Sequence, residues 1–128
     1  MKETNQLSRS LEDYLEQIYL LEREGKAVRV TDIAAALQIS KPSVNRAINT
    51  LKEEGYLSHE HYGTITLTQE GVQAAEGVFE HHKLLKRFLV DFLGVDGITA
   101  EQEACLMEHA ISKDTGGKLK EFMDNLEA

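Results

Sequence analysis

Two short helical segments joined by a tight turn constrain most strongly what this chain can fold into. Thr31 is the expected N-cap of a first segment over residues 32–37, and the turn Gln38-Ile39-Ser40 follows it. Ser40 is placed to cap a second helix with Pro42 in its first turn, where the missing N–H costs nothing. The inner apolar stripe of that helix consists of Val44, Ile48 and Leu51, and Gly55 is expected to end the helix. This pattern predicts a helix-turn-helix.

The residues on both sides of this pair extend the pattern. Residues 56–59 and 64–68 alternate apolar and polar side chains around Gly63, which predicts a β-hairpin. Residues 10–24 carry apolar side chains at helical spacing, with Ser10 as the expected N-cap. A helix, a helix-turn-helix and a hairpin in this order predict a winged helix.

The chain after Thr68 has the pattern of helices alone. A long amphipathic helix is expected over residues 72–92, and Thr99 is the expected cap of a further helix that runs to about Ser112. Gly116-Gly117 is expected to break it before a last short helix. The expected fold is mainly α, with a winged helix-turn-helix and small β-hairpin wing over residues 1–70 and an all-helical region over residues 71–128.

Charge is distributed unevenly along this acidic chain of 128 residues and net charge −8. Residues 26–58, which contain the helix-turn-helix, hold five basic side chains against three acidic ones. The acidity of the whole chain therefore does not exclude a nucleic-acid partner for this segment. The acidic remainder is compatible with a bound cation, because clustered carboxylates often serve as ligands.

The expected location is the cytoplasm, without a membrane partner. No apolar run approaches the roughly 18 residues that cross a bilayer. The first ten residues, MKETNQLSRS, lack the apolar core of a signal peptide. Cys105 is the single cysteine, which excludes an internal disulfide and suits a reducing compartment.

Three kinds of metal ligand share one face of the predicted helix over residues 100–112. Cys105, Glu108 and His109 offer a thiolate, a carboxylate and an imidazole, and Glu101 falls in the same arc of about 80°. Taken alone, this face is equally compatible with a small buried cysteine beside a solvated glutamate and histidine. The cluster therefore needs support from elsewhere in the chain.

Two acids and a histidine provide that support. Asp13 and Glu16 lie one turn apart on the first helix, although Asp13 near the helix start also favours the dipole and Glu16 is compatible with plain exposure. His82 lies in the apolar stripe of the long helix, where a lone histidine is more often a core residue than a ligand, and His81 is expected to face solvent.

No catalytic triad or phosphate-binding glycine loop is present, and these ligands leave no evident general base, so a hydrolytic metalloenzyme is the least supported alternative.

Four motifs in order then resemble a known family. They are Glu12–Tyr19 (EDYLEQIY), Lys41–Val44 (KPSV), His82–Leu85 (HKLL) and the pair Glu108-His109. The sequence resembles the diphtheria-toxin-repressor family of metal-dependent bacterial transcription regulators, in particular its short manganese-sensing branch. The resemblance implies a homodimeric repressor of metal-homeostasis genes that reads an inverted repeat in double-stranded DNA, with residues 71–128 serving dimerisation and metal binding.

The resemblance also implies a set of metal ligands. They are Asp13, Glu16, His82, Cys105, Glu108 and His109. Cys105 matches the iron branch, since the manganese branch has a glutamate there, and Lys86 replaces the acid of the iron branch's ancillary site. A separate ancillary metal site is therefore not expected. A closely spaced pair of metal ions bridged by Glu16, as in the manganese branch, is compatible with these residues. Carboxylates with imidazole suit Mn²⁺ or Fe²⁺, and a thiolate favours Fe²⁺, Co²⁺ or Zn²⁺, so Fe²⁺ or Mn²⁺ is the expected signal.

The start of the second helix of the helix-turn-helix is expected to lie at the DNA. The residues are Ser40, Lys41, Pro42, Ser43 and Arg46. Arg46 is suited to a bidentate pair with guanine, and Lys41 and Ser43 to phosphate. The alternative function is a winged-helix regulator that needs no metal and responds to a small organic ligand, which would leave the Cys105 face unexplained.

Overall fold

A computed structural model describes residues 7–59 and 63–127 of the chain. The chain divides into two compact units, Met1–Glu76 and Gly77–Ala128. The tip of the predicted wing, residues 60–62, and the start of the N-terminal segment, residues 1–6, lie outside the described residues. Within the described ranges, no helix is both long and apolar enough to cross a membrane.

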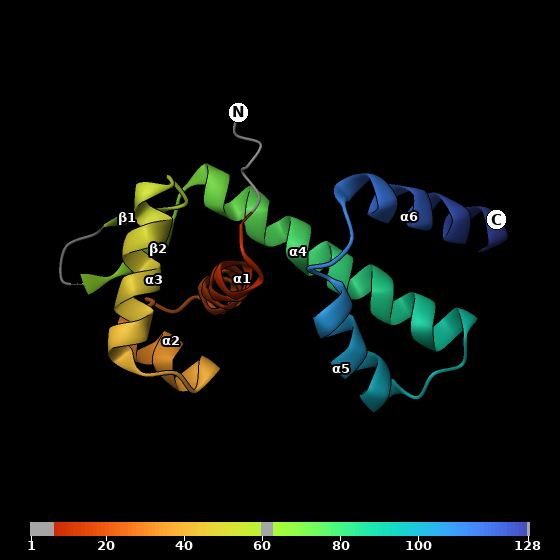
Figure 1. The fold of residues 1–128 in the computed structure, drawn as a ribbon, viewed down its shortest axis with the longest axis horizontal. Coiled ribbons are helices and arrows are strands. Elements are labelled where there is room, and N and C mark those ends of the chain that lie inside the picture. Colours follow the sequence, from red (N-terminus) through yellow and green to blue (C-terminus); the bar gives the residue numbers. More distant parts are fainter. Residues whose placement is uncertain (1–6, 60–62, 128) are drawn as a thin grey trace. The chain divides into compact units, whose positions relative to one another are not determined.

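Unit 1 has the predicted winged-helix architecture (Figure 1). Its elements are α1 (Arg9–Arg23), α2 (Val30–Leu37), α3 (Lys41–Glu53), β1 (Leu57–His59), β2 (Ile65–Leu67) and the first residues of α4 (Gln69–Arg87). The two strands are antiparallel, with Leu57 opposite Leu67. Val28, in the connection from α1 to α2, forms an isolated bridge with Ile65 of β2. The hairpin and the helix-turn-helix are thereby confirmed.

The core of unit 1 fixes which face of α3 points outward. Its largest fully buried side chains are Leu15, Ile18, Val28, Ile33, Val44 and Leu51. The predicted inner stripe of α3 is confirmed, because Ile48 and its neighbours in the stripe are at most 3% exposed. Burying one face of this amphipathic helix leaves the opposite face to solvent.

Two of the three predicted caps in this unit are wrong. Ser8, not Ser10, caps α1, and its hydroxyl oxygen accepts a hydrogen bond from the Leu11 N–H at 3.2 Å. α2 begins at Val30 instead of after Thr31, because the Asp32 carboxylate accepts from the Arg29 N–H at 2.9 Å. Neighbouring cap-forming residues compete for such positions, and tertiary packing selects between them. At α3 the prediction is confirmed, since Ser40 accepts from the Ser43 N–H at 3.3 Å.

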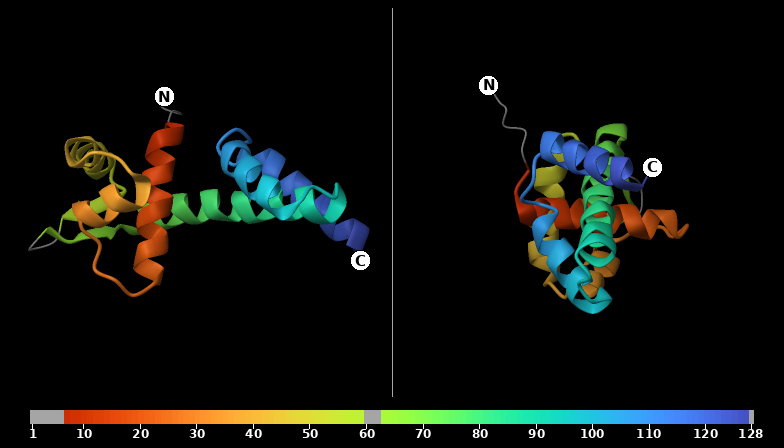
Figure 2. Two further views of the ribbon diagram at one scale, coloured as in Figure 1. Left: turned by 90° about the horizontal axis from the view of Figure 1, so that it is seen from below. Right: turned by 90° about the vertical axis from the view of Figure 1, so that its right-hand side faces the viewer.

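Unit 2 contains the rest of α4 and the helices α5 and α6 (Figures 1 and 2). The elements after α4 are η3 (Phe88–Phe92), α5 (Gly97–Met107) and α6 (Lys113–Glu127). The predicted long helix therefore ends in a wider π-helical turn, η3, which apolar periodicity does not reveal. α6 is tied to α4 by ion pairs from Arg87 to Asp124 and Glu127, and Met123 of α6 is fully buried.

The predicted ends of the last two helices are wrong. Asp96, not Thr99, caps α5, with its carboxylate accepting from the Ile98 N–H at 2.9 Å. α5 ends at Met107, well before Ser112. Gly116 and its neighbour Gly117 do not break a helix but lie inside α6. A glycine pair is tolerated there because tertiary packing overrides its low helix propensity.

Candidate metal centre and DNA-binding helix

A histidine, a cysteine and a glutamate converge in unit 2. His82 of α4 directs Nδ1 toward Glu108, whose Oε1 lies 2.7 Å away. The Sγ atom of Cys105 lies 3.8 Å from the same nitrogen. The ligand atoms of these three residues all lie within 4.8 Å of one another. Imidazole, thiolate and carboxylate at this spacing are a donor set that fits a divalent transition-metal ion.

Glu108 is the centre of this group. It is 3% exposed, which is unusual for a glutamate without a charged or metal partner. Its second oxygen, Oε2, lies 3.2 Å from Nε2 of His109, so the carboxylate contacts an imidazole on each side. Because α5 ends at Met107, Glu108 and His109 lie in the turn after the helix.

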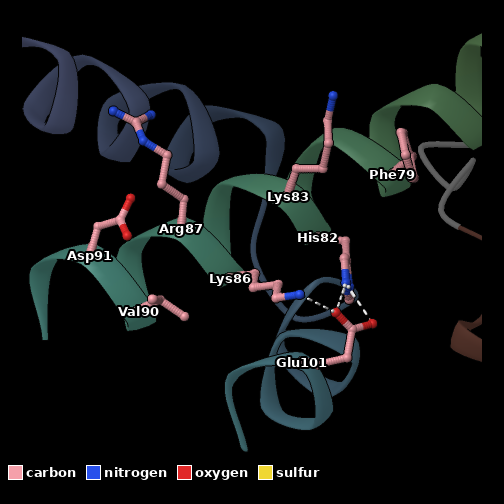
Figure 3. Close-up of a pocket in the computed structure, with 8 residues that line it drawn as sticks. All are labelled: Phe79, His82, Lys83, Lys86, Arg87, Val90, Asp91 and Glu101. Atoms are coloured by element: carbon pink, nitrogen blue, oxygen red, sulfur yellow. Dashed lines mark hydrogen bonds and ion pairs between the residues drawn. The ribbon is translucent and has the colours of Figure 1, made fainter. Parts of the chain in front are cut away.

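Glu101 contacts the other side of the His82 ring (Figure 3). It lies 3.1 Å from Nε2, and Nζ of Lys86 lies 3.1 Å from the same carboxylate. The hydrogen bond from His82 holds the pKa of Glu101 below its ordinary value; partial burial opposes this effect and Lys86 adds to it. The sequence placed Glu101 in the ligand arc but gave it no role.

His81 contradicts the prediction that it faces solvent. It is half-buried, and its Nδ1 lies 3.4 Å from the backbone carbonyl oxygen of Glu108. Its ring also lies against Gly116 of α6 so closely that a Cβ atom there would come within 2.6 Å of Nε2. His81 thus contacts the turn that carries Glu108 and the helix that follows it.

The remaining predicted ligands belong to unit 1. Asp13 and Glu16 lie on α1, on the same side one turn apart, and both are half-buried. Of the predicted set, the structure of unit 2 brings together His82, Cys105, Glu108 and His109. The part of Asp13 and Glu16 in metal binding stays a prediction.

The predicted DNA-contacting residues lie together at the start of α3. Ser40, Lys41, Pro42 and Arg46 are exposed, and Ser43 is half-exposed. Nη2 of Arg46 donates a hydrogen bond to the Ser43 hydroxyl oxygen at 3.2 Å. Ser40 donates to the same oxygen at 3.0 Å. The arginine is therefore held along the outer face of the helix, where a polar surface can meet a groove of DNA.

Comparison with protein families decides between the alternatives. The model of the iron-dependent repressor N-terminal DNA-binding domain matches residues 6–65. The model of the iron-dependent repressor metal-binding and dimerisation domain matches residues 68–128. The chain belongs to the iron-dependent repressor family. It is a metal-dependent, DNA-binding transcriptional regulator with a dimerisation domain and is not an enzyme. The family match confirms the resemblance drawn from the sequence motifs and does not favour the metal-independent alternative.

Individual relatives agree with this assignment. The chain is 42% identical over 119 residues to an uncharacterised HTH-type transcriptional regulator of Methanocaldococcus jannaschii, covering 92% of this chain and 95% of that one. It is 34% identical over 118 residues to the HTH-type transcriptional regulator MntR of Lysinibacillus sphaericus, covering 92% and 84%. A manganese-dependent transcriptional repressor solved with manganese matches with a TM-score of 0.81 and 29% identity over 89% of this chain. This chain spans 52%, about half, of the length of that solved chain.

Proposed function

We propose that this regulator senses Fe²⁺ or Mn²⁺ and represses metal-homeostasis genes. The observation that carries the proposal is the convergence of His82, Cys105 and Glu108, whose ligand atoms lie within 4.8 Å of one another. Manganese is supported by the name of the solved manganese-dependent repressor. Iron is supported by the thiolate of Cys105, a donor that favours Fe²⁺, Co²⁺ or Zn²⁺ over Mn²⁺.

The proposed ligand set contains residues of both units. Asp13, Glu16, His82, Cys105, Glu108 and His109 are its members. A bound divalent cation would supply the positive charge that offsets repulsion among their carboxylates. Without that charge, Asp13 and Glu16 of one unit disfavour the approach of Glu108 of the other, because like charges repel strongly where water is excluded. The carboxylates thereby select between conformations of the regulator, and DNA binding follows the selected one.

The proposed DNA partner is a double-stranded inverted repeat bound by a homodimer. Residues 1–70 are the proposed DNA-binding domain and residues 71–128 the proposed dimerisation and metal-binding domain. A two-fold dimer presents two recognition helices to successive major grooves, so the half-sites should be about one helical turn apart. Ser40, Lys41, Pro42, Ser43 and Arg46 are the proposed contacts, with Arg46 at base edges. The proposed location is the cytoplasm, consistent with a DNA-binding family and a single cysteine.

The decisive experiment is an anaerobic DNA-binding titration, one metal at a time. EDTA-treated protein is mixed with a DNA fragment that contains its operator, and Fe²⁺, Mn²⁺, Co²⁺ or Zn²⁺ is added in separate mobility-shift series. A further series with Mg²⁺ is the control, and we expect DNA affinity to rise with Fe²⁺ or Mn²⁺ and not with Mg²⁺. The variant His82→Ala should lose this response while keeping its helical circular dichroism.

The variant Cys105→Glu tests the role of the thiolate in selectivity. Replacing the soft sulfur with a carboxylate should move the response toward Mn²⁺ and away from Co²⁺ and Zn²⁺. The matched control is Glu103→Gln, an exposed acid two residues away on the same helix. DNA affinity that is independent of every metal would refute the proposal and restore the alternative of an organic effector.

A further inference from the structure

The two ring nitrogens of His82 have different surroundings. Nδ1 faces the candidate metal ligands Glu108 and Cys105, at 2.7 Å and 3.8 Å. Nε2 faces Glu101, with both carboxylate oxygens at 3.1 Å. The side chain is 13% exposed, so water has little access to either nitrogen. The neighbouring side chains, and not solvent, therefore determine which ring nitrogen of His82 coordinates an ion.

Glu101 is in turn held by a lysine. Nζ of Lys86, on α4 one turn after His82, lies 3.1 Å from Oε1 of Glu101 (Figure 3). The side chains of this pair are 43% and 49% exposed. An ion pair so exposed adds little to stability. The ion pair instead orients Glu101, because it keeps the Glu101 carboxylate beside Nε2 of His82.

We propose that Glu101, held by Lys86, keeps a proton on Nε2 of His82 and so makes Nδ1 the nitrogen that coordinates the metal. The inference rests on the proposed function, which takes His82 as a ligand. A neutral imidazole carries one N–H, and a carboxylate acceptor beside one nitrogen fixes the proton there. Metal-bound histidines commonly donate their second N–H to such a partner, which orients the ring and raises its basicity.

Glu108 does not fix the opposite arrangement. It also contacts His82, but from the Nδ1 side and as a member of the ligand set itself. Once its oxygens are engaged by a cation, they no longer compete for the ring proton. Glu101 keeps its contact with Nε2, because Lys86 neutralises its charge from the solvent side. Glu101 and Lys86 are thus positioning residues and not ligands.

Nuclear magnetic resonance of the zinc-loaded protein tests the assignment directly. Zn²⁺ is suitable because it is redox-inert and has a filled d shell. The full chain with ¹⁵N-labelled histidine is titrated with Zn²⁺ alone, and two-bond ¹H–¹⁵N correlations identify the nitrogen that coordinates. We expect Nδ1 of His82 to bear the metal and Nε2 to keep a slowly exchanging proton. Coordination through Nε2 would overturn the proposal.

Variants separate positioning from general destabilisation. In Glu101→Ala we expect Zn²⁺ affinity to fall about 10-fold to 100-fold, the range for loss of such outer partners, and the Nε2 proton to exchange faster. Glu101→Gln keeps an acceptor oxygen and should restore the Nδ1-coordinated spectrum and most of the affinity. Glu103→Ala, an exposed position on the same helix, is the control and should change neither readout.

The contribution of Lys86 is tested against its neighbour Lys83. Both line the pocket drawn in Figure 3, but Lys83 pairs with Glu80 at 3.2 Å. Lys86→Met should weaken Zn²⁺ binding and broaden the His82 signals, whereas Lys83→Met should not. Equal effects of the two lysine variants, or of Glu101→Ala and Glu103→Ala, would refute the positioning roles. A wild-type protein that takes up no Zn²⁺ at all would instead refute the proposed metal centre, so the two failures are distinguishable.

Discussion

Replacing Gly116 with alanine should destabilise the second unit, whereas the same change at Gly117 should stabilise it. Both glycines lie inside α6, so both substitutions gain the higher helix propensity of alanine. They differ in their surroundings. A Cβ atom on Gly116 would lie 2.6 Å from Nε2 and 3.0 Å from Cδ2 of His81, and one on Gly117 would have no neighbour within 4 Å.

The magnitude follows from these two terms. The gain from replacing glycine inside a helix is about 0.5–1 kcal/mol at either position. The His81 ring must shift to admit the Cβ at Gly116, and because the ring is half-buried and contacts the Glu108 carbonyl oxygen, this overpacking costs about 1–3 kcal/mol at Gly116 alone. We therefore expect the free energy of unfolding to rise by about 0.5–1 kcal/mol in Gly117→Ala. The Gly116→Ala variant should lie about 1–3 kcal/mol below it.

The contact with His81 adds a second readout. Nδ1 of His81 lies 3.4 Å from the carbonyl oxygen of Glu108, so a displaced ring disturbs the turn that carries two candidate ligands. Zn²⁺ affinity measured by calorimetry should fall in Gly116→Ala and stay unchanged in Gly117→Ala. Urea unfolding of both variants, with and without His81→Ala, completes a double-mutant cycle. If Gly116→Ala is as stable as Gly117→Ala, or if removing the His81 ring does not relieve its cost, the reasoning from steric contact is wrong.

Three further changes test other parts of the chain. In Gly71→Ala the added Cβ would collide with the backbone carbonyl of Tyr56, which cannot rotate away, so unfolding in urea should show a loss of about 1–3 kcal/mol or more. Hydrogen bonds from the Thr99 hydroxyl and from backbone N–H groups lower the pKa of Asp96. The stabilisation by this carboxylate is therefore present above its unfolded pKa of about 4 and is lost as pH falls through the lower folded value. In acid-unfolding series, the stability difference between wild type and Asp96→Ala should shrink below about pH 4. Arg46→Ala should weaken operator binding by about 1–3 kcal/mol in mobility shifts and leave Zn²⁺ calorimetry unchanged, because the arginine lies on α3 and outside the candidate ligand set.

The winged helix was predictable because its signals are local. Ser40 and Pro42 mark one helix start without a competing cap, and the structure has α3 begin there. Alternation of apolar and polar residues predicted both strands of the hairpin. At α1 the sequence offers two serines within one turn, and periodicity alone did not distinguish Ser8 from Ser10. The boundary between domains near residue 70 stays a prediction.

The helical region was harder to predict because its turns depend on contacts between distant segments. Gly116-Gly117 has the composition of a helix break, yet α6 passes through it. The missing side chain at Gly116 accommodates the ring of His81, a contact that spacing along the chain does not show. The sequence predicts that His81 faces solvent for the same reason. Side-chain chemistry did identify Cys105 and Glu108, whose ligand atoms lie within 4.8 Å of each other.

The early end of α5 changes how the candidate metal centre is built. The Glu108 N–H still donates a helical hydrogen bond to the Ala104 carbonyl oxygen at 2.9 Å, so Glu108 is the C-cap of α5. A helix that continued to Ser112 would also fix the residues after it, beginning with His109. Instead α5 ends at Met107, and the two candidate ligands lie in a turn whose backbone contacts His81. Their geometry therefore depends on the packing of α6 against α4, through the same contact that Gly116→Ala perturbs. Metal affinity should accordingly follow the stability of α6 docking across variants of this region, even where no ligand is changed.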